Sequence, residues 1–115
     1  IMPVESEPYP DPYDPVAVAA AARSAAEIGA HVVKTSMPTP PEQVALAVTC
    51  GLPVVIAGGD PTPDTDALLD RVERAVAAGA AGVAFGRNVW GSPDPAGMVR
   101  RLRAAVHGRS GDTRD

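Results

Sequence analysis

Residues 53–85 read PVVIAGGDPTPDTDALLDRVERAVAAGAAGVAF, which places an apolar run, a polar loop, a helical pattern and a second apolar run in succession. The first run is rich in β-branched residues and predicts a buried strand over 53–57. Asp64 can cap the helix that follows, and Gly79 is placed to end it. Residues 82–85 then predict another strand. Two strands joined by a helix in this way must be parallel.

The same order of strand, loop and helix repeats along the chain. Outside residues 53–85, the expected elements are a strand over 1–6, a helix over 16–28 capped by Gly29, a strand over 30–34, a helix over 39–50 and a helix over 95–106. About four such units predict an α/β fold with a parallel sheet, close to half of a (βα)8 TIM barrel of about 250 residues. An open four-stranded sheet is the alternative. A half-barrel would expose two unpaired sheet edges, which a partner usually covers. The face of the sheet away from the helices would carry Val32, Val55 and Val83 without cover.

Composition narrows the classes of partner. The chain has 115 residues, a net charge of −4 and no basic block before its tail, so nucleic-acid binding is not expected. No apolar stretch approaches the roughly 20 residues of a membrane span. The single cysteine, Cys50, excludes an internal disulfide and fits a reducing, cytoplasmic setting. We therefore expect a small-molecule or protein partner.

Lys34 is the single lysine in a chain that otherwise uses nine arginines. An ammonium group can be tuned to lose its proton and act as a nucleophile, whereas a guanidinium group cannot. A lysine at the end of an expected strand therefore indicates a need for its amine. The alternative is a lysine whose stem lies over apolar surface at the strand end.

Other chemical groups follow the expected strands at the same rim, because ligands of parallel α/β folds collect at the carboxyl ends of the strands. Glu7 and Tyr9 follow the first strand, and either can move a proton beside the amine or face water. The later strands end in two glycine turns, which favour phosphate binding through backbone amides, with an arginine to add charge. The predicted phosphate-binding residues are Gly58, Gly59, Gly86 and Arg87. His31 and His107 lack a metal-ligand pattern.

Three motifs, residues 30–36, 54–59 and 82–90, resemble the last three strands of the archaeal-type class I fructose-bisphosphate aldolases. This (βα)8-barrel family also includes amino-dideoxy-heptulosonate synthases. The resemblance implies that the chain is the C-terminal half of the barrel, with strands five to eight over residues 1–108 and a disordered polar tail over 109–115. It also implies that Lys34 forms the Schiff base and that Tyr9 is the acid/base group, with Glu7 beside it.

The implied activity is that of a class I aldolase, a carbon–carbon lyase of carbohydrate metabolism acting on a phosphorylated ketose or related sugar phosphate, with no cofactor and no metal. The implied partner is the missing N-terminal half-barrel or a second copy in a homo-oligomer. Two alternatives stay open: a non-catalytic half-barrel that serves as a subunit or interaction module, and an aldolase relative for another phosphorylated sugar or cyclitol fragment. Activity of the isolated chain is a separate question.

Overall fold

The structure, a computed structural model, describes residues 11, 13–58 and 62–108. The strand expected over residues 1–6 and the tail over 109–115 lie outside these residues. The elements are α1 (Pro15–Glu27), β1 (Val33–Ser36), the 3-10 helix η1 (Pro41–Gln43), α2 (Val44–Val48), β2 (Val54–Ala57), α3 (Thr65–Ala77), β3 (Gly82–Ala84), α4 (Arg87–Trp90) and α5 (Pro95–His107).

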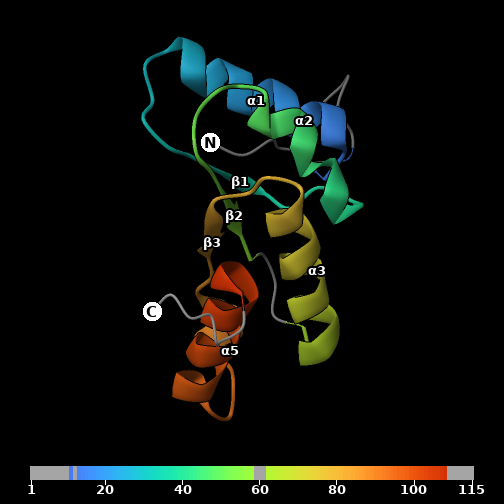
Figure 1. Ribbon diagram of the computed structural model, residues 1–115, viewed down its shortest axis with the longest axis vertical. Helices are drawn as coiled ribbons and strands as arrows, with labels where there is room; N and C mark the ends of the chain where they lie inside the picture. Colours follow the sequence, from blue (N-terminus) through green and yellow to red (C-terminus); the bar gives the residue numbers. More distant parts are fainter. Residues whose placement is uncertain (1–10, 12, 59–61, 109–115) are drawn as a thin grey trace.

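The three described strands form one parallel sheet in the order β1-β2-β3. Helices join each strand to the next, as the sequence predicts (Figure 1). Spatial order follows chain order, so each crossover advances in the same direction around the sheet. A barrel wall has this order, and so does each half of a doubly wound sheet, which reverses direction only at its switch point. The α/β fold and its parallel sheet are confirmed.

Local signals placed most helix ends correctly. The carboxylate of Asp64 accepts a hydrogen bond from the backbone N–H of Ala67 at 3.0 Å and caps α3. Gly29 and Gly79 follow α1 and α3 with φ of 99° and 121°, a conformation that residues with a Cβ rarely adopt. The helix expected over 39–50 is instead divided into η1 and α2.

Strand β1 begins later than the sequence predicted. The N–H of Ala30 is bound to the carbonyl of Ala25 at the end of α1, so this residue still belongs to the helix terminus. Pairing with the neighbouring strand starts where the N–H of Val33 donates to the carbonyl of Pro53 at 2.9 Å, and it continues to Ser36. Lys34 therefore lies within the strand, two residues before its end.

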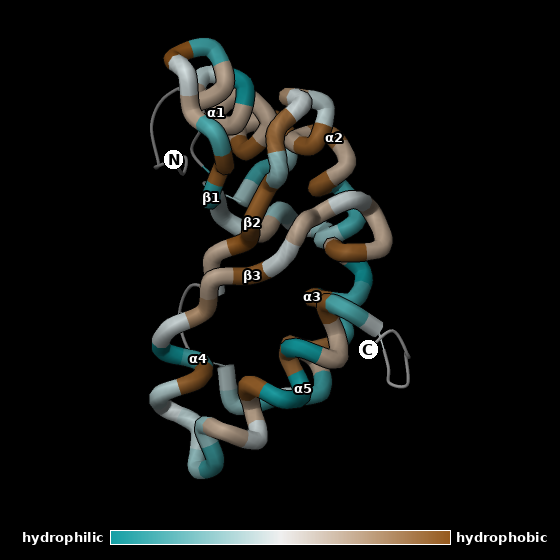
Figure 2. The backbone as a smooth tube through the Cα atoms, turned by 60° about the vertical axis from the view of Figure 1, so that its left-hand side comes forward, coloured by the Kyte–Doolittle hydropathy of each residue, from teal (hydrophilic) through white to brown (hydrophobic). Residues whose placement is uncertain are grey.

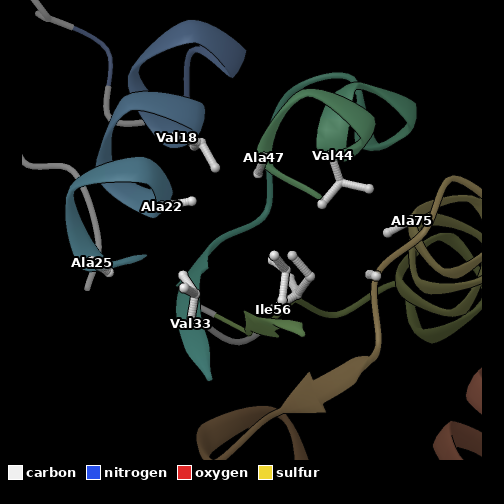
Figure 3. Packing of buried hydrophobic residues seen from close by; sticks show 10 residues of the cluster. Val18, Ala22, Ala25, Val33, Val44, Ala47, Ile56 and Ala75 are labelled. Carbon is white, nitrogen blue, oxygen red and sulfur yellow. The ribbon is translucent and has the colours of Figure 1, made fainter. Parts of the chain in front are cut away.

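One face of the sheet carries the hydrophobic core. Val33 and Ile56 are fully buried against α1 and α2, from which Val18, Ala22 and Val44 point toward them (Figure 3). Valine and alanine fill most of this space, so the helices lie close to the sheet, as the composition suggested. A second cluster joins α3, α4 and α5 through Val72, Val89, Met98, Leu102 and Ala105. In Figure 2, α3 and α5 alternate between hydrophobic and hydrophilic segments, as helices with one buried side do.

The opposite face of the sheet was predicted to expose Val32, Val55 and Val83. The structure corrects this for Val83, which pairs with buried Ile56 and packs against both core clusters. A shift of one residue in register moves a side chain to the other face of a strand. The open face instead carries side chains that alternate with the buried ones in β1 and β2, namely Lys34, Ser36, Val55 and Ala57.

Ion pairs link the helical layer. Arg74 of α3 donates hydrogen bonds to both carboxylate oxygens of Glu42 in η1, and it also contacts Asp70. The bond from Arg74 lowers the pKa of Glu42 below its ordinary value and raises that of the guanidinium group. Arg101 of α5 contacts Asp66 of α3 at 2.8 Å. Within the described part of the chain, no helix is long and apolar enough to cross a membrane.

Candidate active site

The carboxyl ends of β1, β2 and β3 meet at one rim of the sheet. Ser36 pairs with Ala57, and Ala57 pairs with Ala84, so the segments that follow these residues leave the sheet side by side. The rim therefore brings together the loop after β1, Gly58 after β2, and Gly86 with Arg87 after β3. Three of the four predicted phosphate-binding residues lie among the described residues at this rim.

Lys34 lies on the open face of the sheet, below the rim. Its neighbours in sequence, Val33 and Thr35, are completely buried on the helical side, and strand alternation directs Lys34 to the other side. The residue is exposed and pairs with Val55, so an apolar neighbour flanks it on that face. In a closed barrel this face lines the interior. The amine would then point into the barrel toward the rim where ligands bind.

Gly58 is required for packing. A Cβ atom built on it would lie 2.7 Å from Cδ1 and 2.9 Å from Cγ of Phe85, and 3.2 Å from Nδ2 of Asn88. The space beside this glycine is therefore occupied by protein, so the absence of a side chain allows β2 and the end of β3 to approach each other. Sequence reasoning assigned this glycine to anion approach alone.

Gly86 has different surroundings. No heavy atom of a described residue outside its chain neighbours lies within 4 Å of a Cβ built on it, and its φ of −113° suits any residue. It precedes α4, a helix of four residues where the sequence predicted a glycine turn. Arg87 is the first residue of this helix and is exposed at the rim. Open space at the Cβ position of Gly86, next to an exposed cation, is compatible with an anionic ligand.

Asn88 is a residue of the site that sequence reasoning missed. Its side chain is 6% exposed, and its Oδ1 accepts a hydrogen bond from the backbone N–H of Thr62 at 3.0 Å. The bond joins the start of α4 to the segment that leads into α3. A buried amide pairs with a partner because an unsatisfied polar group costs free energy. The sequence offered no signal, since an asparagine after Gly-Arg is also common in exposed turns.

Tyr9, Glu7 and Gly59 lie outside the described residues, so their predicted roles stay predictions. Within the described ranges, no group of three or more histidine, cysteine, aspartate or glutamate side chains is placed to hold a metal ion. The chemistry that the described rim offers is an amine on the open face, backbone amides beside Gly86 and the charge of Arg87. A parallel sheet with this wall topology and these groups at its carboxyl rim is typical of the (βα)8-barrel enzymes.

Comparison with known proteins agrees with that class. The chain matches the DeoC/LacD family aldolases over residues 2–92 and belongs to this family. It is 40% identical over 98 residues to 2-amino-4,5-dihydroxy-6-oxo-7-(phosphonooxy)heptanoate synthase of Streptomyces griseus, across 84% of the chain and 36% of that enzyme. It is 41% identical over 96 residues to fructose-bisphosphate aldolase class 1 of Halobacterium salinarum, across 82% of the chain and 36% of that enzyme.

A solved structure supports the same grouping. An archaeal fructose-1,6-bisphosphate aldolase with its catalytic lysine covalently bound to the carbinolamine intermediate of the substrate superposes with a TM-score of 0.80 at 36% identity. The match covers 85% of this chain and 40% of that one. The resemblance to archaeal-type class I aldolases is thereby confirmed. The chain spans between 36% and 40% of the length of each of these three proteins.

Proposed function

We propose that the chain forms strands five to eight of a (βα)8 barrel that acts as a class I aldolase on a phosphorylated ketose. One observation carries the proposal: the single lysine of the chain lies on the open face of a parallel sheet, just below its carboxyl rim, in a member of an aldolase family. An amine at that position can reach a substrate held at the rim. A structural neighbour whose catalytic lysine binds its substrate covalently supports the same chemistry.

In this mechanism the neutral amine of Lys34 attacks the ketone carbon of the substrate and forms a carbinolamine. Loss of water gives a protonated iminium. The carbon–carbon bond next to it then breaks, its electron pair moves toward the iminium nitrogen, and an enamine forms. At the same time the hydroxyl of the departing aldehyde loses its proton to a base. Protonation of the enamine carbon and hydrolysis of the renewed iminium release the second product and restore Lys34.

Tyr9 is our candidate for the group that moves the proton, with Glu7 beside it as a second candidate. A phenol or carboxylate within hydrogen-bond reach of the substrate hydroxyl can take this role. Gly58, Gly59, Gly86 and Arg87 would hold the phosphate. For Gly86 and Arg87 the support is the open space beside the glycine and the exposed arginine. Fixing the phosphate would orient the ketone toward the lysine.

Closure of the barrel is part of the proposal. A groove runs beside β3 between the sheet and α5, and its lining includes apolar Val83, Phe85, Leu102 and Val106 together with Arg103 and His107. We propose that the N-terminal half-barrel, or a second copy of the chain, covers this side and pairs with the sheet edge. An unpaired edge beside apolar surface is usually covered in this way. A cytoplasmic location, inferred from the single Cys50, stays a prediction.

A second substrate class has specific support. The synthase from Streptomyces griseus is about as similar to the chain as the aldolase from Halobacterium salinarum, at 40% and 41% identity. The name of each relative describes a phosphorylated compound, but the carbon skeletons differ. The shared proposal is therefore Schiff-base carbon–carbon chemistry on a phosphorylated substrate, with the ketose as first choice.

Substitution of the lysine tests the activity. In the longest polypeptide that carries this chain, Lys34→Arg keeps the positive charge but removes the nucleophilic amine. We expect the rate of fructose 1,6-bisphosphate cleavage to fall at least about a thousandfold, the usual scale for loss of a nucleophile. The control is Arg23→Met, which removes an exposed cation from α1, near the end of the helix that leads to the amino end of β1 and away from the rim, and should leave the rate unchanged. Wild-type-like cleavage by Lys34→Arg would refute the mechanism.

A further inference from the structure

We propose that Asn88 is a positioning residue for the phosphate site. Its side chain is bonded to Thr62 and lies beside Gly58, and it thereby holds these two residues at a fixed distance from Gly86 and Arg87 at the start of α4. This inference rests on the proposed function, because it takes the two glycine turns as the phosphate site. It adds a residue that does not itself contact the phosphate and acts through the backbone segments that do.

The hydrogen bond of Asn88 spans a large separation in the chain. Oδ1 accepts from the N–H of Thr62, which lies 26 residues earlier, at 3.0 Å. A backbone N–H can only donate, so its partner must be the amide oxygen and not the amide nitrogen. The orientation of the side-chain amide is thereby determined.

The amide nitrogen of Asn88 lies on the side of Gly58, the residue that follows β2. A Cβ built on Gly58 would lie 3.2 Å from Nδ2. The side chain is therefore bonded to Thr62 through its oxygen and lies beside Gly58 with its nitrogen. One buried side chain is thus adjacent to two residues that follow β2.

The backbone of Asn88 belongs to the second glycine turn, the one that follows β3. Asn88 follows Gly86 and Arg87 directly, and α4, which contains it, packs against α5. The contacts of its side chain with Thr62 and Gly58 consequently restrain the distance from Gly58 to Gly86 and Arg87, the described residues that would hold the phosphate. Binding by several fixed donors weakens when their spacing becomes variable, because the donors must then be ordered on binding.

Asparagine combines the properties that this position requires. Its oxygen accepts the bond from Thr62, and its shape fits beside Gly58. Aspartate would keep an acceptor oxygen but place a negative charge next to the proposed phosphate. Leucine has the same branching and the same number of side-chain heavy atoms but would leave the N–H of Thr62 without this acceptor. Comparing these two replacements distinguishes the effect of losing the hydrogen bond from the effect of adding a negative charge.

The test compares Asn88→Leu and Asn88→Asp with Val89→Ala in the longest polypeptide that carries the chain. Val89 is the next residue of α4 and is 7% exposed, so its truncation loosens packing at the same place without removing the bond. Two quantities are measured: the hydrogen-exchange rate of the Thr62 amide by NMR, and kcat and KM for fructose 1,6-bisphosphate. Inhibition by inorganic phosphate provides a second measure of anion binding.

In Asn88→Leu we expect exchange of the Thr62 amide to be about tenfold faster, the scale of one lost hydrogen bond. KM and the inhibition constant for inorganic phosphate should rise by about the same factor, with kcat within about twofold. Asn88→Asp should keep Thr62 protected but still raise KM through its charge. Val89→Ala should leave both Thr62 exchange and KM within about twofold, since it keeps the bond.

Three results would overturn the proposal: unchanged Thr62 exchange in Asn88→Leu, faster exchange with unchanged KM, or an equal rise of KM in Val89→Ala. If Asn88→Leu does not fold, hydrogen exchange is measured in the wild-type protein instead. A Thr62 amide that exchanges there at the rate of an unprotected peptide would exclude the hydrogen bond. Absence of cleavage and of phosphate inhibition in the wild-type protein would contradict the proposed function. Thr62 exchange would then still test the hydrogen bond by itself.

Discussion

Replacement of Gly58 by alanine should destabilise the protein, whereas the same replacement at Gly86 should not. Both glycines follow strands at the proposed phosphate site, and both substitutions add one methyl group. At Gly58 the added carbon would lie 2.7 Å from Cδ1 of Phe85, closer than real Cβ atoms approach their neighbours. At Gly86 no heavy atom of a described residue beyond the chain neighbours lies within 4 Å.

The expected changes in unfolding free energy follow from this difference in surroundings. A methyl group forced into occupied space usually costs about 1–3 kcal/mol of unfolding free energy, because side chains or backbone must shift. We expect a loss in that range for Gly58→Ala. Gly86 has a φ of −113° that alanine adopts without strain, so Gly86→Ala should stay within about 0.5 kcal/mol of the wild type. Its methyl group would instead occupy the proposed anion position and weaken phosphate binding.

Urea unfolding followed by circular dichroism measures the change in stability, with all proteins at equal concentration because assembly changes apparent stability. Inhibition by inorganic phosphate measures the change in phosphate binding. Phe85→Ala provides a further check, since removal of the ring should abolish the penalty of Gly58→Ala and give a coupling energy of about 1–3 kcal/mol. Wild-type stability of Gly58→Ala, or additive effects with Phe85→Ala, would refute the packing argument.

The remaining predictions concern the anion, the ion pair and assembly. Arg87→Ala should weaken binding of phosphorylated ligands by about 1.5–3 kcal/mol in calorimetry and spare unphosphorylated analogues, whereas equal losses would assign Arg87 a structural role. Arg74 lowers the pKa of Glu42, so ionised Glu42 stabilises the fold above its ordinary pKa of 4.5 and this contribution is lost as the pH falls. The melting temperatures of wild type and Glu42→Gln should therefore converge below about pH 4.5, and a constant difference would contradict the pairing. In light scattering, the isolated chain should be dimeric, bound to a complementary fragment or aggregated at micromolar concentration; a compact, cooperatively unfolding monomer would favour a self-contained α/β domain.

The parts of the fold that depend on local chemistry could be read from the sequence. Gly29, Gly79 and Asp64 were placed correctly because left-handed backbone and helix capping are decided within a few residues. Strand ends were less predictable, since they depend on pairing between distant segments. Strand β1 starts at Val33 because its ladder begins with Pro53, which no local pattern near Val33 reveals. The face of Val83 was missed for the same reason.

The candidate site was predictable to a different extent. Lys34, Gly86 and Arg87 could be proposed because an isolated lysine and a glycine before an arginine are visible in short segments, and their roles stay predictions. Asn88 was not, because its importance comes from burial and from a bond to Thr62, 26 residues away. Helix α4 has four residues, too few to show a periodic pattern. The phosphate role expected of Gly58 stays a prediction, and the close neighbour that the structure shows beside it is Phe85.

Covalent trapping at Lys34 tests the central claim most directly. The longest polypeptide that carries the chain is incubated with dihydroxyacetone phosphate and reduced with borohydride, which converts an iminium into a stable secondary amine. Peptide mass spectrometry should find one reduced ligand on Lys34, the single lysine of the chain, and none in Lys34→Arg. Unmodified Lys34 in a preparation that cleaves the phosphorylated ketose would contradict the Schiff-base mechanism.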